Sequence, residues 1–222
     1  MEKSTPIIFD RNTVEFVTVA AEFCGFLERT SGMKRRNFVD KALKLLPLLY
    51  LKASLLPAGE RIDEADPETF VTEGDYERVR GGIAALMGNM DDFLDVFLED
   101  MAYSDTPITQ TISENLADVY QVLKDFICVY QLGLDKTMND ALIICNEHFA
   151  GFWGQRLLNA MRALHDVKYG HHTDDGTDDE MSEEELYRNS PLASDAGITE
   201  DDLYEGLDAG EEDDGSGDRW EE

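Results

Sequence analysis

The chain has 222 residues and a formal net charge of −29, because 48 acidic side chains stand against only 19 Lys and Arg residues. Nucleic acids and anionic membranes both bind positive surfaces, so this balance argues against either one as a partner. The longest apolar run, residues 45–51, is far shorter than the ~20 residues that a membrane-spanning helix needs.

The cysteines and the N-terminus indicate the compartment. Cys24, Cys128 and Cys145 lie among apolar neighbours without any Cys-x-x-Cys spacing. An odd number of isolated cysteines is typical of reduced core thiols. Residues 1–11 contain no apolar stretch of the kind found in signal peptides. We therefore expect a soluble, cytoplasmic protein without disulfides.

The negative charge is concentrated at the C-terminal end. Residues 173–222 contain 21 carboxylates and two basic side chains, which is −19 of the total, whereas residues 1–172 contain 27 acidic and 17 basic side chains. So acidic a stretch cannot be buried in a core. The sequence predicts a helical bundle domain over residues 1–170 and an acidic tail over 171–222, which is largely extended or disordered.

Two wide apolar faces predict the first two helices, near residues 13–30 and 34–55. Apolar residues recur in two adjacent stripes at steps of three and four in each range. Asn12 followed by Glu15 gives a plausible N-terminal cap of the first helix, and Gly32 ends it. Pro47 lies inside the second helix and predicts a kink. Residues 57–72 are predicted to be a loop.

Three further helical patterns follow. One runs from Tyr76 to Met101 across Gly81, Gly82 and Gly88, so it predicts either one kinked helix or two shorter ones. The next begins with the capping pair Thr111 and Glu114 and ends at Gly133. The last extends from about residue 137 to 168, and its stripe shifts by one position near Phe152, as expected when a straight helix drifts against a heptad repeat. Strand patterns are absent, so we predict an all-α, antiparallel bundle of about five long helices.

The acidic tail contains a repeat. Residues 182–187 read Ser-Glu-Glu-Glu-Leu-Tyr, and residues 199–204 read Thr-Glu-Asp-Asp-Leu-Tyr. A hydroxyl cap followed by three acids favours a short helix, near 182–189 and 199–207, but segments of this length are unstable alone. Either the tail is simply solvated, or it docks on its own body or on a protein partner. The anchors in that case are Leu186, Tyr187, Leu203 and Tyr204.

A candidate docking surface is the basic second helix. Residues 29–52 contain seven of the body's seventeen basic side chains and only one acid, Asp40. An alternative is that these long side chains merely cover the rim of an apolar helix. The cluster that would receive the tail is Lys34, Arg35, Arg36, Lys41 and Lys52.

Candidate catalytic and metal-binding residues are few. His148 and His165 are out of phase on one helix. His171 and His172, followed by Asp174 and Asp175, could loosely hold a metal, but their position at the start of the tail favours adventitious binding. We therefore expect no metal, no cofactor and no catalytic residues. The acidic group Asp91, Asp92, Asp95 and Glu99 is interpreted as the solvated edge of a helix.

The small residues around Trp153 allow two helices to approach closely, and the Trp side chain is expected to fill the adjoining gap. The side chains that would line a pocket there are Trp153, Arg156, Arg162 and His165. The alternative is ordinary core packing with satisfied polar tips.

Two segments resemble an uncharacterised bacterial family of all-helical proteins, a domain of unknown function. They are residues 112–125, Ile-Ser-Glu-Asn-Leu-Ala-Asp-Val-Tyr through Leu-Lys-Asp, and residues 152–165, which contain Phe-Trp-Gly and Ala-Met-Arg-Ala-Leu-His. The resemblance covers roughly residues 10–168 and implies a helical bundle but no activity. The family usually has His where this chain has Phe152, so any polar role of that position is lost here.

The leading hypothesis is a non-catalytic helical interaction protein whose acidic tail docks on its own basic helix or on a protein partner. The alternative is a small-ligand-binding protein or an enzyme with a pocket near Trp153, Arg162 and His165. No nucleic-acid or membrane partner is expected, and the sequence does not determine the oligomeric state.

Overall fold

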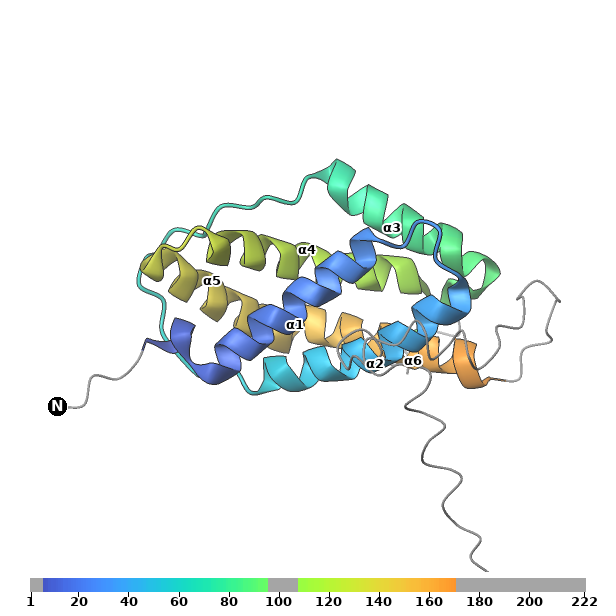
Figure 1. Ribbon diagram of the computed structural model, residues 1–222, viewed down its shortest axis with the longest axis horizontal. Helices are drawn as coiled ribbons and strands as arrows, with labels where there is room; N and C mark the ends of the chain where they lie inside the picture. Colours follow the sequence, from blue (N-terminus) through green and yellow to red (C-terminus); the bar gives the residue numbers. More distant parts are fainter. Residues whose placement is uncertain (1–5, 96–107, 171–222) are drawn as a thin grey trace, which may run out of the picture. The chain divides into compact units, whose positions relative to one another are not determined.

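The computed structural model describes residues 6–95 and 108–170, which fold as the predicted helical bundle (Figure 1). These residues form six α-helices, and the last two continue into each other through a π-helical segment. The helices are α1 (Arg11–Glu28), α2 (Arg35–Ser54), α3 (Glu73–Met87), α4 (Ile112–Gln131), α5 (Asp135–His148) and α6 (Gly154–Tyr169). The two short helices predicted near 182–189 and 199–207 lie outside the described residues.

Helix α4 is the centre of the bundle, because it packs against α1, α3, α5 and α6. Its strongly amphipathic sequence buries one wide face, and Leu116, Val119 and Leu123 on that face are fully buried. Helix α2 packs between α1 and α6, and α1 crosses α4 obliquely (Figure 1). Each long helix therefore buries its apolar stripe against a neighbour, as the predicted periodicity requires.

Large aromatic side chains fill the middle of the core. The ring of Phe16 on α1 lies 5.6 Å from that of Phe126 on α4 and 6.4 Å from that of Trp153. Trp153 is fully buried, and its indole N–H donates a 2.9 Å hydrogen bond to the carbonyl oxygen of Cys145. This bond satisfies the one polar atom that the indole brings into the core.

Side-chain caps begin several helices. Asp10 accepts a hydrogen bond from Asn12 N at 2.9 Å and caps α1, so the cap lies two residues before the predicted Asn12. Thr111 accepts from Glu114 N at 3.1 Å, which confirms the predicted cap of α4. Thr72 and Asp75 form a reciprocal capping box at the start of α3.

The pattern from Tyr76 to Met101 is not one helix. Helix α3 ends at Met87 because Gly88 has a φ of +56°, a conformation that glycine adopts without strain. A short 3₁₀ turn, η2 (Gly88–Met90), leads into strand β1 (Asp92–Leu94), which pairs antiparallel with β2 (Thr109–Thr111). The prediction that strands are absent is therefore wrong here. Strands of three residues are too short to show an alternating pattern.

The one-residue shift of the last apolar stripe also has a different cause from the predicted drift. Residues Phe149–Trp153 form the π-helix η4 between α5 and α6. A π-turn accommodates one extra residue, which rotates all following side chains and moves the stripe by one position. Another 3₁₀ turn, η1 (Ile7–Phe9), precedes α1 and packs against α5.

Candidate functional site

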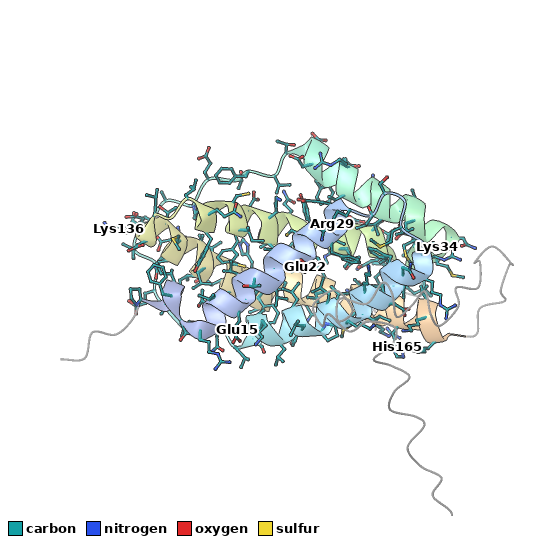
Figure 2. The ribbon with its side chains drawn as sticks, in the orientation of Figure 1. Glu15, Glu22, Arg29, Lys34, Lys136 and His165 are labelled. Carbon is teal, nitrogen blue, oxygen red and sulfur yellow. The ribbon has the colours of Figure 1, made fainter. Side chains whose placement is uncertain are left out.

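A shallow groove of about 700 Å³ lies between α2 and α6. We call it the α2–α6 groove. Its floor is apolar, and two basic side chains of α6 stand on its wall; Figure 2 labels one of them, His165. The lining residues are Leu43, Pro47, Met161, Arg162, His165 and Tyr169.

The groove is held together at its α6 side by ionic and ring contacts. Lys168 forms an ion pair with Asp40 of α2, and this interaction raises the pKa of Lys168. The rings of His165 and Tyr169 lie 4.7 Å apart, one helical turn from each other. The pairing of Lys168 with Asp40 leaves Arg162 and His165 as the basic groups that line the groove itself.

The structure divides the predicted basic cluster between two flanks of α2. Arg36 is in helical phase with Leu43 and Pro47, so it lies in the row that borders the α2–α6 groove. Lys34, Lys41 and Lys52 share the opposite flank, where Lys52 contacts Glu15 of α1 at 2.5 Å.

Arg35 follows Lys34 directly at the start of α2, and Figure 2 labels Lys34 there. Both residues have polar interactions within the protein. The predicted cluster therefore does not occupy one face of α2, and none of its members lines the α2–α6 groove.

The four residues predicted to line one pocket are also separated. Trp153 is part of the core and does not line the α2–α6 groove. Arg156 contacts Asp118 at 3.3 Å and Gln110 at 3.2 Å, and its guanidinium lies 5.5 Å from the centre of the Phe152 ring. Of the four, Arg162 and His165 lie together, on the wall of the groove.

The loop between α2 and α3 is a strap tied across α4 and α5 by two carboxylates. Asp140 of α5 accepts hydrogen bonds from the backbone N–H groups of Ile62 and Asp63, at 2.7 and 2.9 Å. Asp125 of α4 accepts from the N–H groups of Phe70 and Val71, at 2.6 and 2.8 Å. The strap, residues 57–72, is thus fixed at two points, one on each helix.

Asp140 remains ionised despite its burial. Burial opposes the charge, but the hydrogen bonds from Ile62, Asn139 and Asp63 and the charge of Arg61 together outweigh it, so the pKa of Asp140 is lowered. Sequence reasoning did not identify Asp140 or Asp125. The signal was the unusual length of the connection, because long loops without helices or strands are uncommon inside a compact domain and are often functional.

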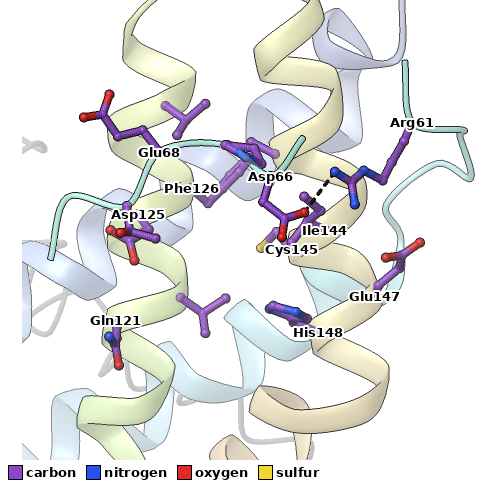
Figure 3. Close-up of a pocket in the computed structure, with 15 residues that line it drawn as sticks. Arg61, Asp66, Glu68, Gln121, Asp125, Phe126, Ile144, Cys145, Glu147 and His148 are labelled. Atoms are coloured by element: carbon purple, nitrogen blue, oxygen red, sulfur yellow. Dashed lines mark ion pairs between the residues drawn. The ribbon is translucent and has the colours of Figure 1, made fainter. Parts of the chain in front are cut away.

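Beneath the strap lies a second cavity of about 380 Å³, which we call the strap pocket (Figure 3). Its floor consists of apolar side chains of α4 and α5. The floor residues are Val122, Phe126, Val129, Ala141, Ile144 and Cys145. Burial raises the pKa of the Cys145 thiol, so this group behaves as part of the apolar floor rather than as a nucleophile.

Carboxylates stand on both sides of the strap pocket. Asp66 and Glu147 lie on the α5 side with Arg61, and Glu68 and Asp125 lie on the α4 side (Figure 3). Asp66 contacts Arg61 at 2.9 Å, which neutralises the one permanently charged cation of the lining. His148 and Gln121 complete the polar rim.

A third polar group ties the β-pair to the helices. Asp91 accepts from Ser113 N at 2.8 Å and from Ser113 Oγ at 2.6 Å, so it caps α4 from the preceding segment. Asp95 accepts from the side chain of Gln110. The interpretation of this acidic group as a solvated helix edge is wrong for Asp91 and Asp95, which are buried, while Asp92 is exposed and Glu99 lies outside the described residues.

The remaining predictions concern metal sites, membrane-spanning helices and residues outside the described part of the chain. Within residues 6–95 and 108–170, no group of three or more His, Cys, Asp and Glu side chains has a metal-binding arrangement. No helix in the same ranges is long and apolar enough to cross a membrane. The predicted anchors Leu186, Tyr187, Leu203 and Tyr204, and also His171 and His172, lie outside the described part of the chain.

Comparisons with known proteins agree with the fold. A family model described as "Domain of unknown function (DUF5063)" matches residues 7–170. A crystal structure of protein BF1032 from Bacteroides fragilis, a structural-genomics target, is 56% identical in sequence, with a TM-score of 0.67. The match covers 75% of this chain and 98% of that one. A comparison with curated proteins found no match.

Proposed function

The chain belongs to the family described as Domain of unknown function (DUF5063), and from this premise we propose that it is a non-catalytic helical interaction protein. Its α2–α6 groove binds an acidic segment that carries Leu-Tyr anchors. The occupant is the chain's own segment 182–207. The observation that carries this proposal is the open apolar groove with Arg162 and His165 on its wall, in a chain of net charge −29.

Chemical complementarity supports this occupant. The groove offers an apolar floor for Leu and Tyr side chains, and Arg162 on its wall carries a positive charge. Each copy of the repeat has three acids directly before its Leu-Tyr pair. Apolar anchors supply affinity by burial, whereas the carboxylates guide the approach and make it sensitive to salt.

Chain connectivity supports docking within one molecule. Tyr169 is the last residue of α6 and lines the groove. Only residues 170–181 separate it from Ser182, and an extended chain of that length spans up to about 40 Å. A tethered segment binds at a high effective concentration, so modest contacts are enough.

The test uses full-length protein in which Leu186, Tyr187, Leu203 and Tyr204 are all replaced by Ser. We expect the NMR signals of the Met161 methyl group and the His165 ring to shift relative to the unmodified chain at low salt. A control with Leu192→Ser and Trp220→Ser changes apolar residues outside the repeat and leaves both signals in place.

A second test of docking reverses one charge in the groove. Arg162→Glu repels the acidic segment and is expected to reproduce the shift of the Met161 signal. Lys136→Glu on α5 changes the charge equally at the opposite end of the bundle (Figure 2) and leaves Met161 unaffected. If neither the anchor variant nor Arg162→Glu differs from its control, docking in the groove is wrong.

A further inference from the structure

The strap pocket is independent of the α2–α6 groove, and its chemistry specifies a class of ligand. We infer that it binds a linear aliphatic diamine or polyamine. Such a ligand would lie along the apolar floor with one ammonium group at the Asp66 and Glu147 side and another at the Glu68 and Asp125 side. The proposal rests on the cavity, its apolar floor and the carboxylate-bearing residues that line its two sides.

The size and the walls of the cavity fit a small organic molecule. A volume of about 380 Å³ lies in the ordinary range of small-molecule sites, which are concave, mostly apolar and equipped with a few placed polar groups. Phe126, Val129 and Ile144 supply the surface against which a methylene chain loses its contact with water.

The charges of the lining exclude anions. Four carboxylates, those of Asp66, Glu68, Asp125 and Glu147, line the cavity together with a single guanidinium, that of Arg61. Arg61 is paired with Asp66, so the lining is net negative and disfavours phosphates and carboxylic acids. Ammonium groups donate charge-assisted hydrogen bonds to carboxylates, which are stronger than neutral ones.

Two of the carboxylates have no cationic partner among the described residues. Glu68 and Glu147 form no ion pair there, and Asp125 uses Oδ1 for both strap amides, which leaves Oδ2 for another donor. Because the pairs stand on opposite sides of an apolar floor, a dication with a hydrocarbon spacer matches the lining better than a compact cation does.

The strap gives the site its fixed form. Asp140 and Asp125 tie the strap to α5 and α4, so hydrogen bonds within the protein itself hold Asp66, Pro67 and Glu68 over the floor. A pre-formed site avoids the cost of ordering a loop on binding.

The test titrates the full-length protein with cadaverine and spermidine and follows two NMR signals. One is the ring of His148, which lines the pocket; the other is the indole N–H of Trp153, which is bonded to Cys145 in the floor. Both signals are expected to shift saturably. Glutarate, a dianion of similar length, causes no shift.

Paired variants separate the pocket from the acidic tail, which also attracts cations. Asp66→Asn with Glu147→Gln removes two pocket carboxylates and is expected to weaken binding at least about tenfold. The control, Asp63→Asn with Glu64→Gln, removes two carboxylates from the same strap outside the pocket and changes affinity by less than about twofold.

A further variant keeps every carboxylate. Thr69→Lys places an ammonium group on the strap beside the cavity and is expected to abolish the shifts by occupying the ligand's position. Titration without movement of His148 and Trp153, or equal affinity of the two double variants, overturns the proposal. Tighter binding of a Lys-containing peptide than of spermidine overturns the assignment to a free polyamine.

Discussion

At the scale of single residues, Gly154 is the described glycine at which an added Cβ would meet the closest neighbour. An added Cβ would lie 2.4 Å from the carbonyl oxygen of Phe149 and 3.0 Å from its ring, because the π-turn brings that residue close. A Cβ added at Gly151, in the same turn, would have nothing within 4 Å. The two glycines therefore have different roles although they are close in the chain.

Gly154→Ala is expected to lower the free energy of unfolding by about 1–3 kcal/mol, because the backbone of the π-turn must move to accommodate the methyl group. Gly151→Ala is the matched control and should be neutral or slightly stabilising, since Ala favours helix over Gly. Urea unfolding of both variants measures the difference. Equal effects of the two substitutions would show that the π-turn does not require glycine.

Asp140 is the residue that connects stability of the strap to pH. Its folded pKa is lowered, so the bonds that it accepts stabilise the fold above the ordinary Asp pKa of about 3.9 and are lost as the pH falls through the folded value. We expect amide exchange of Ile62 and Asp63 to accelerate, after correction for intrinsic rates, as the pH falls below about 4.

Asp140→Asn should accelerate exchange of the same amides at neutral pH, because an amide side chain presents only one acceptor oxygen to two N–H donors. Asp63→Asn is the control, since the side chain of Asp63 accepts no hydrogen bond among the described residues. Unchanged exchange in Asp140→Asn would contradict the role of this carboxylate as a tie.

At the scale of elements, Asp91 connects the β-pair to the central helix. It accepts from both the N–H and the hydroxyl of Ser113 and is 7% exposed. Asp91→Ala is expected to reduce the free energy of unfolding by about 1–2 kcal/mol, as the loss of a helix cap does. Asp92→Ala, on the exposed neighbour, should have little effect. Thermal or urea unfolding of the two variants distinguishes these outcomes.

The long helices could be predicted from sequence because their apolar stripes are local and repeat over many residues. Helix α4 is the clearest case: its cap at Thr111 and its stripe to Tyr130 are confirmed. The β-pair could not be predicted, because three-residue strands carry no period. The π-turn was visible only as a shift of the stripe, and ordinary helical drift gives the same shift.

The sites were harder to predict than the helices, for a physical reason. Periodicity determines which face of a helix is buried, but not which neighbour borders each flank. The basic side chains of α2 therefore looked like one cluster, although Arg36 and Lys52 lie on different flanks of the helix and Lys52 contacts Glu15 of α1. The strap pocket depends on Asp140 and Asp125 meeting strap residues that are distant in the sequence.

At the scale of the whole molecule, the protein joins a bundle that belongs to a known family to an acidic segment that the family model does not match. Residues 1–172 carry a net charge of −10, and residues 173–222 carry a net charge of −19. Two acidic parts repel each other at long range, so docking requires a local surface of opposite charge and apolar contacts. The α2–α6 groove has both.

The most direct measurement of this claim places a nitroxide spin label at Ser190→Cys, in a Cys128→Ser background, and records relaxation of the Met161 methyl and the His165 ring. Docking in the groove predicts strong broadening of both signals at low salt, weaker broadening at high salt, and none with Ser at the four Leu-Tyr positions. Mixing spin-labelled protein with isotope-labelled, nitroxide-free protein should give no broadening. Broadening in that mixture as well would mean that a second copy occupies the groove, and no broadening in any sample would contradict docking altogether.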